Sequence, residues 1–248
     1  MVATSLKSLP EIAAYPPTWL PGRPQVGNYV DALTHQPFGL FFRNSLIVAA
    51  GTILGDLLAA SLVAYGFARF RFPGRDVLFV ILLSTMMVPF VVRLVPLFVI
   101  FQKLGWVNTF YPLIVPHWFG TPFFIFLMRQ FFLTIPAELA ESARIDGASE
   151  FAIWWRIMLP LTRPALLVIA IFSFQYTWND FLAPLIFLND TSMKTVTLGL
   201  YSMIGFSGQE SWNWIMAAAT AIGLPVVVVF YLFQRQFIQG VTISGVKG

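Results

Sequence analysis

Five long apolar stretches dominate this sequence and constrain its fold more than any other feature. A helix needs about 20 mostly apolar residues to cross a lipid bilayer. The stretches cover, to within a few residues, 44–68, 77–101, 111–132, 164–188 and 212–233. No segment long enough for a membrane strand alternates apolar and polar residues with a period of two. The sequence therefore predicts an all-α integral membrane protein, a bundle of five transmembrane helices.

The composition agrees with a bilayer environment and excludes several kinds of site. Charged residues make up 10% of the chain and apolar residues 58%, whereas a soluble domain carries about 25% charge. The chain has no cysteine, which excludes disulfides, thiolate zinc sites and cysteine nucleophiles. The net charge of +4 comes without a clustered basic face, so we expect no nucleic-acid binding. We also predict no catalytic residue, bound cofactor or metal site.

Lysine and arginine predict the orientation of the chain, because short loops rich in these residues stay in the cytoplasm. Nine of the fifteen basic residues fall on one side of an alternating path and five on the other. The first set is Arg69, Arg71, Arg75, Arg129, Arg144, Arg156, Arg163, Arg235 and Lys247, and the second is Lys7, Arg23, Arg43, Lys103 and Lys194. We therefore expect a cytoplasmic C-terminus, with the tail 234–248 on that side, and an external N-terminus.

The first forty residues differ from the rest. Residues 8–28 contain five prolines and two glycines, and proline lacks the backbone donor that a helix needs. We expect residues 1–43 to be an extended or looped external segment, followed by a membrane domain over 44–248. Since five spans with an external N-terminus is an unusual topology, we also expect that a first span is missing before Met1.

The connection over 133–163 is the longest of those predicted to be cytoplasmic, and such length usually has a function. Pro136 suits a first helical turn, and Ala137, Ala140, Ala143 and Gly147 recur at helical spacing, so they line a face with almost no side chain. Another backbone can approach such a face closely.

Two residues of this connection predict a helix–turn–helix. Gly147 is expected to end the first helix in a left-handed conformation, and Ser149 to cap a second helix with Glu150 in its first turn. The second helix carries Phe151, Trp154 and Trp155 and ends at Leu159 and Pro160. This connection has the form of a lever for a soluble partner, but an amphipathic helix at the membrane surface would have the same pattern.

The spacing within the connection carries a resemblance to a known family. Glu141-Ser142-Ala143 is followed after three residues by Gly147, and after nine more by Ile157-Met158-Leu159-Pro160. This sequence resembles the "EAA" loop of bacterial ABC importer permeases, with Ser142 in place of the usual alanine. Trp178-Asn179-Asp180-Phe181 and the tail from Gly240 to Gly248 resemble the carbohydrate-uptake branch, at the second permease of a maltose-type importer. That family has six helices.

The resemblance implies partners and site residues. The loop would dock on one of two ATPase subunits, which use ATP and Mg, and a second homologous permease and an extracytoplasmic solute-binding protein would complete the importer in a bacterial or archaeal cytoplasmic membrane. The residues implied to couple to the ATPase are Glu141, Ser142, Ala143, Arg144, Asp146, Gly147, Leu159, Pro160 and Lys247. None of the four lysines follows a glycine, so the chain lacks a phosphate-binding loop of its own.

Polar residues inside the spans are candidates for the transport path, because charge in a bilayer is costly and usually faces a protein interior or water. Arg93 lies between Pro89 and Pro96, which should bend that helix. The alternative roles for Arg93 are an ion pair with Asp56 or Asp180, or a side chain that reaches to the outer surface of the membrane. The amides and aromatic rings of Gln175, Tyr176, Trp178 and Asn179 suit a sugar, and Asp180 is a candidate for the path because it is a charged residue within the same span. Hydrogen bonding between helices is the alternative for this group. We expect His117 at the external interface.

Two other functional classes stay open. Asp56 and Asp180 could carry protons in a secondary transporter driven by an ion gradient, although no inverted repeat is evident. The same two carboxylates could form the catalytic pair of an intramembrane hydrolase, if they met within hydrogen-bonding reach. Neither alternative explains the connection over 133–163.

Overall fold

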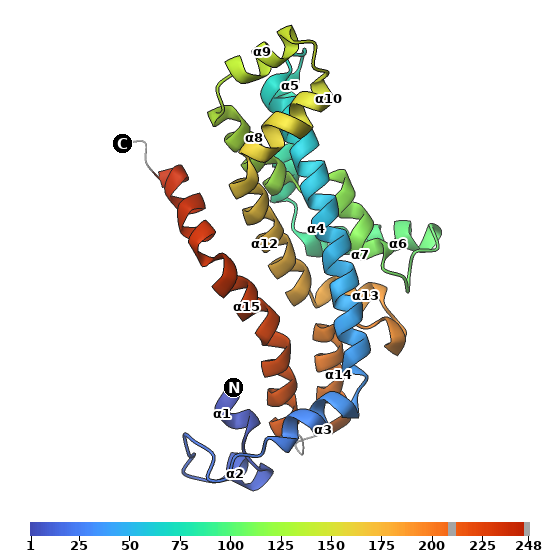
Figure 1. Cartoon of the computed structure of the whole chain (residues 1–248). Helices are drawn as coiled ribbons and strands as arrows, with labels where there is room; N and C mark the ends of the chain where they lie inside the picture. Colours follow the sequence, from blue (N-terminus) through green and yellow to red (C-terminus); the bar gives the residue numbers. More distant parts are fainter. Residues whose placement is uncertain (208–211, 246–248) are drawn as a thin grey trace. The chain divides into compact units, whose positions relative to one another are not determined.

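The computed structural model describes residues 1–207 and 212–245, and side chains for 1–204 and 212–233. Every regular element within these residues is a helix (Figure 1), which confirms the predicted all-α class. The chain divides into two compact units. Unit 1 comprises Met1–Val48, Asn108–Phe110 and Gln175–Phe233, and unit 2 comprises Ala49–Val107, Tyr111–Phe174 and Gln234–Gly248.

Among the described residues, three helical segments are long and apolar enough to cross a membrane alone: Phe38–Arg69, Tyr111–Thr134 and Trp212–Phe233. The first is helix α4, whose 32 residues extend roughly 48 Å, beyond a hydrocarbon core of about 30 Å. The second consists of α7 (Tyr111–Ile114), η2 (Val115–Phe119) and α8 (Pro122–Thr134). The third belongs to α15, which continues to Gly245, so most of the expected tail is helical.

Two bent helix pairs raise the number of candidate spans in the described residues to as many as five. The first pair replaces the single helix predicted over 77–101. Here α5 (Arg75–Ser84) and the turn η1 (Thr85–Met87) are followed by α6 (Phe90–Lys103), at an angle of 98°. The break lies at Val88, whose extended backbone (φ −82°, ψ 111°) is what a residue before proline prefers.

The second pair joins Glu150–Leu161 to α12 (Arg163–Asn179) at 79°. At its other end, α12 stops at Asn179, so the helix predicted over 164–188 ends early. Oδ1 of Asp180 accepts the backbone N–H of Leu182 at 3.1 Å and of Ala183 at 3.4 Å, which starts the short helix α13 (Leu182–Phe187). A further helix, α14 (Val196–Ser207), was not predicted.

The N-terminal segment is more helical than expected. It contains α1 (Val2–Ser5), α2 (Leu9–Ala13) and α3 (Gly27–His35). The prediction was wrong for α2 because Pro10 lies in the first turn, where no donor is needed, and Ser8 and Glu11 form a capping box. Asn28 then fixes the segment within unit 1, since its amide donates to the carbonyls of Ser5 and Lys7 and accepts from Asn213.

Unit 2 has an apolar core that joins the membrane helices to the 133–163 connection. Buried residues from α4, α8 and α12 meet buried residues of the connection itself, among them Ala140, Ile153, Trp154 and Met158. Figure 1 shows α9 and α10, the helices of this connection, at the same end of unit 2 as α5 and α8. The connection is therefore part of the folded core and not a loop that extends freely.

Candidate functional site

The first helix of the connection is α9 (Glu138–Ile145). It begins two residues after Pro136, with Glu138 and Glu141 in its first turn, where carboxylates interact favourably with the helix dipole. Part of the predicted small-residue face is turned toward the protein, whereas Ala137 and Gly147 are exposed. Ala140 is buried in the core of unit 2, and Ala143 packs against it. The absence of long side chains on this face thus allows α9 to lie close to the unit's own helices.

Gly147 ends α9 as predicted, with φ of +82°. The N–H of Ala148 donates to the carbonyl of Ala143 at 2.9 Å, and the N–H of Gly147 to that of Arg144 at 3.0 Å. These two bonds define a Schellman turn, which needs a left-handed residue at the glycine position. A Cβ added at Gly147 would meet nothing within 4 Å. It is therefore the backbone conformation, and not the space around the residue, that favours glycine there.

The second helix begins at the predicted cap. Oγ of Ser149 accepts the N–H of Ala152, and α10 (Glu150–Ile153) is followed by the π-helical turn η3 (Trp154–Met158) and by α11 (Leu159–Leu161). Trp154 is buried, whereas Phe151 and Trp155 are exposed. Pro160 lies in α11, directly after the π-helical turn η3.

The turn at Gly147 brings Arg144 back onto Glu150. Nε of Arg144 donates to Oε1 of Glu150 at 2.5 Å, and Nη2 donates to Oε2 at 3.3 Å. The Arg144 hydrogen bond holds the pKa of the Glu150 carboxyl below its ordinary value. Oε2 also accepts the hydroxyl of Tyr65 at 2.7 Å, so one carboxylate joins α9, α10 and α4.

The other face of the turn is open. Glu141, Ser142 and Asp146 are exposed, and Ile145 is 87% and Phe151 66% exposed. Apolar side chains exposed to this degree beside carboxylates are typical of a surface that another protein covers. Phe151 was named from the sequence as part of the second helix but not as a site residue. Ile145 was not named as a site residue, although an apolar residue next to Asp146 at the end of a polar helix was a usable signal. Lys247 lies outside the described residues.

Asp56 is fully buried in α4 and makes a polar cluster within unit 2. Its Oδ1 accepts the Thr121 hydroxyl at 2.6 Å, its Oδ2 accepts the Ser173 hydroxyl at 2.7 Å, and Nδ1 of His117 lies 3.1 Å from Oδ1. His117 was expected at the external interface, but here its ring faces Asp56. Arg93 is not among the donors to Asp56 in the described part of the chain.

The candidate path residues have different surroundings. Arg93 is exposed on α6, with its guanidinium 5.9 Å from the centre of the Phe90 ring. Gln175, Tyr176 and Asn179 are exposed near the end of α12. Trp178 is buried within unit 1, and its indole donates to the carbonyl of Ile222 at 3.0 Å. Trp178 thus makes the hydrogen bond between helices that was its alternative role.

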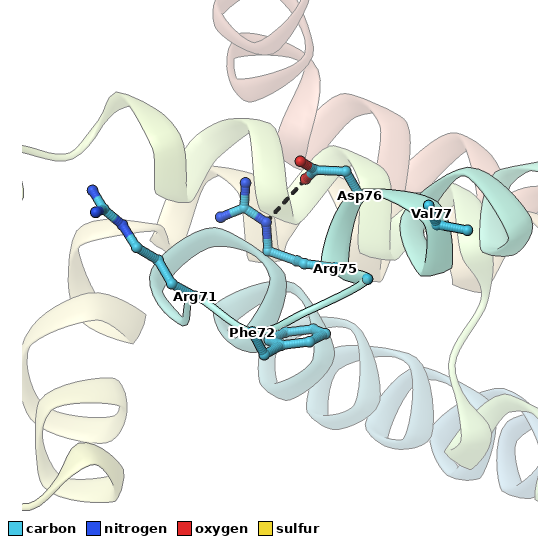
Figure 2. Close-up of a pocket in the computed structure, with 6 residues that line it drawn as sticks. Arg71, Phe72, Arg75, Asp76 and Val77 are labelled. Carbon is cyan, nitrogen blue, oxygen red and sulfur yellow. Dashed lines mark hydrogen bonds and ion pairs between the residues drawn. The ribbon is translucent and has the colours of Figure 1, made fainter.

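A pocket lies at the turn between α4 and α5. Figure 2 shows Arg71, Phe72, Arg75, Asp76 and Val77 around it, together with the bond from Nε of Arg75 to Oδ1 of Asp76 at 2.9 Å. Arg71 is exposed. One of the two arginines is therefore already paired with a carboxylate, so the pocket does not select an anionic ligand strongly.

The comparisons with known proteins identify the family. Residues 42–243 match the sequence profile of the binding-protein-dependent transport system inner membrane component family. This chain belongs to that family. The probable ABC transporter permease protein YurM of Bacillus subtilis is 35% identical over 250 residues, covering 100% of this chain and 82% of YurM. The arabinooligosaccharide permease protein AraQ of Halalkalibacterium halodurans is 38% identical, covering 84% and 74%.

A third relative and a solved structure are also similar to this chain. The sn-glycerol-3-phosphate transport system permease protein UgpE of Yersinia pestis is 36% identical, covering 98% of this chain and 88% of UgpE. The fold matches a crystal structure of a bacterial ABC transporter that imports the acidic polysaccharide alginate, with a TM-score of 0.82 over 94% of this chain and 87% of that chain, at 23% identity. Membership of the permease family confirms the resemblance found in the "EAA" spacing and a multi-pass inner-membrane protein.

Proposed function

We propose that this chain is the permease subunit of an ATP-driven importer for a carbohydrate or a related polyol. The named relatives support this substrate class, because AraQ belongs to an arabinooligosaccharide system and UgpE to an sn-glycerol-3-phosphate system. The subunit forms half of the translocation pathway, and a second homologous permease forms the other half. An extracytoplasmic solute-binding protein delivers the solute, and two ATPase subunits supply ATP hydrolysis with Mg.

The geometry of the 133–163 connection carries this proposal. Its inner face packs into the core of unit 2, while Ile145 and Phe151 are exposed on its outer side. A surface that is rigid on one side and open on the other suits a contact that pushes on the membrane helices. We assign docking on the ATPase to this outer face, with Glu141, Ser142 and Asp146 as polar contacts. Lys247 belongs to the same assignment on resemblance alone.

The orientation of the chain in the membrane and the residues of the solute path are two further parts of this proposal. The basic residues on one side of the membrane support a cytoplasmic location for the connection and for the C-terminus. Arg93, Gln175, Tyr176 and Asn179 are exposed polar residues in helices of a membrane protein, and they are our candidates for contact with solute. The indole of buried Trp178 donates to Ile222, and the Asp180 carboxylate accepts the backbone N–H of Leu182, so we give these two residues a structural role.

The energy source separates this function from an ion-gradient transporter. The chain should be reconstituted in proteoliposomes with its second permease, ATPase and binding protein, and tested for uptake of labelled oligosaccharides and sn-glycerol-3-phosphate. We expect uptake that needs internal ATP and persists when ionophores remove all ion gradients. Uptake that follows an imposed gradient without ATP, and is lost in Asp56→Asn or Asp180→Asn, would contradict the proposal.

A further inference from the structure

The contact between Tyr65 and Glu150 is a polar link from the 133–163 connection to a membrane helix. Tyr65 lies one turn before the end of α4, and its hydroxyl donates to Oε2 of Glu150 at 2.7 Å. The two residues are 85 positions apart in the sequence. The bond therefore joins elements that backbone continuity does not hold together.

The position of the Tyr65 hydroxyl is fixed by packing. The residue is 4% exposed, and its ring meets Phe70 and Phe132 edge-on, with centroids 5.5 Å and 5.9 Å apart. These are favourable aromatic geometries. Because the ring lies between α4 and α8, the hydroxyl cannot follow Glu150 without moving the helices that hold the ring.

Glu150 is fixed from the other side. Both of its carboxylate oxygens accept from Arg144 of α9, and the residue is the first of α10, where the helix dipole stabilises a negative charge. Two-point pairing of a guanidinium with a carboxylate restricts both groups in orientation as well as in distance. A shift of the turn around Gly147 therefore has to displace the Glu150 carboxylate as well.

Arg69 extends the link to α8. It follows Tyr65 by four residues, so the two share one face of α4. Its Nη2 donates to the carbonyls of Phe132 and Ile135 at 2.8 Å and 2.7 Å, at the end of α8 (Pro122–Thr134). The last turns of α4 are thus bonded both to the connection, through Tyr65, and to the helix that leads into the connection, through Arg69.

We propose that Tyr65 and Glu150 are positioning residues that carry the movement of the docked connection into α4. Beside the apolar contacts of the core, Tyr65 is the point at which a hydrogen bond joins the connection to α4, and Glu150 passes the displacement of α9 and α10 to it. This inference rests on the proposed function, since it needs an ATPase that moves the connection. Neither residue has to touch the ATPase or the solute.

The test uses Tyr65→Phe in the complete transporter, reconstituted in proteoliposomes with ATPase and binding protein. This variant removes one hydroxyl and keeps the ring. A hydrogen bond to a charged group contributes enough free energy that its loss should lower the solute transported per ATP roughly tenfold. Assembly and the ATPase rate of the complex should stay within about twofold of the parental values. Tyr201→Phe, at an exposed tyrosine of unit 1, is the matched control.

Three further variants distinguish a specific link between Tyr65 and Glu150 from a general loss of stability. Glu150→Gln keeps an acceptor for the Tyr65 hydroxyl and should retain more transport per ATP than Glu150→Ala. The double variant Tyr65→Phe/Glu150→Ala should be no worse than Glu150→Ala alone, because both changes remove the same bond. Losses that multiply in the double variant would overturn the proposal.

A distance measurement gives a readout independent of transport. The chain has no cysteine, so spin labels can be placed at Glu138→Cys on α9 and Leu62→Cys on α4, both exposed. We expect one narrow distance distribution with and without ATP, and a broader one with ATP in Tyr65→Phe. Unchanged coupling and an unchanged distribution in Tyr65→Phe would overturn this inference alone. A parental protein that never couples to an ATPase would overturn it together with the proposed function.

Discussion

The hydroxyl of Ser173 donates to Oδ2 of Asp56 across 2.7 Å, which joins α12 to α4 inside unit 2. Thr121 bonds the other carboxylate oxygen at 2.6 Å, and His117 lies beside it. Three segments of unit 2 thus share one buried acceptor. The pair of residues was not predicted, because 117 positions separate them and no local pattern indicates the contact.

Replacing Asp56 should lower stability. In Asp56→Ala the hydroxyls of Thr121 and Ser173 and the ring of His117 lose their carboxylate partner. The loss is largest at the buried Ser173, because an unsatisfied buried group costs about 1–3 kcal/mol. Asp56→Asn keeps an acceptor oxygen and should lose less than half as much. The measurement is thermal unfolding of the purified complex in detergent. Asp31→Ala, at an exposed aspartate of α3, is the control, and equal effects of the changes at Asp56 and Asp31 would contradict the account.

Gly147 should tolerate asparagine far better than valine. A left-handed conformation costs an ordinary residue about 1–2 kcal/mol, while asparagine adopts it more readily. Because an added Cβ meets no atom within 4 Å, side-chain size as such should not matter. We expect Gly147→Val to lose most ATP-dependent uptake and Gly147→Asn to keep most of it. Equal uptake by the two variants would show that the turn does not need its backbone conformation.

Alanine variants at Trp178 and Tyr176 should distinguish a loss of stability from a loss of solute transport. Trp178 is buried and bonded to Ile222, so Trp178→Ala should destabilise the protein by about 3–5 kcal/mol. Tyr176 is exposed, and Tyr176→Ala should leave thermal unfolding unchanged while raising the KM for solute uptake several-fold. The two variants are compared by unfolding temperature and uptake kinetics. A Tyr176→Ala protein with normal KM would remove that residue from the path.

The sequence was informative wherever a feature is local. The apolar stretches predicted where the membrane segments lie, but not that two of them would be bent pairs of helices. Gly147 and Ser149 predicted the turn and the cap in the 133–163 connection, because backbone conformation and capping depend on neighbouring residues. Pro89 predicted a bend, though not one of 98°. The early end of α12 at Asn179 was missed, because the polar residues before Phe181 were included in one long stretch that becomes apolar again from Phe181.

Contacts between distant residues could not be predicted from the sequence. The pairing of His117 with Asp56, the bond from Tyr65 to Glu150 and the burial of Trp178 all depend on which helices pack together. The alanine face of α9 was predicted, but its direction was not, since a face without side chains suits the protein's own core as well as a partner. The exposure of Ile145 could be recognised only after the structure showed that the alanine face of α9 points into the core.

Cysteine crosslinking at Ile145 tests the central claim most directly. The chain has no native cysteine, so Ile145→Cys places a single thiol on the outer face of the connection, and Trp19→Cys, 92% exposed in the N-terminal segment, serves as the matched site. In membranes that hold the whole transporter, we predict a crosslink from Ile145→Cys to the ATPase subunit that changes in yield when ATP is added, and none from Trp19→Cys. A transporter that hydrolyses ATP and imports solute, yet forms no crosslink at Ile145, would contradict the account.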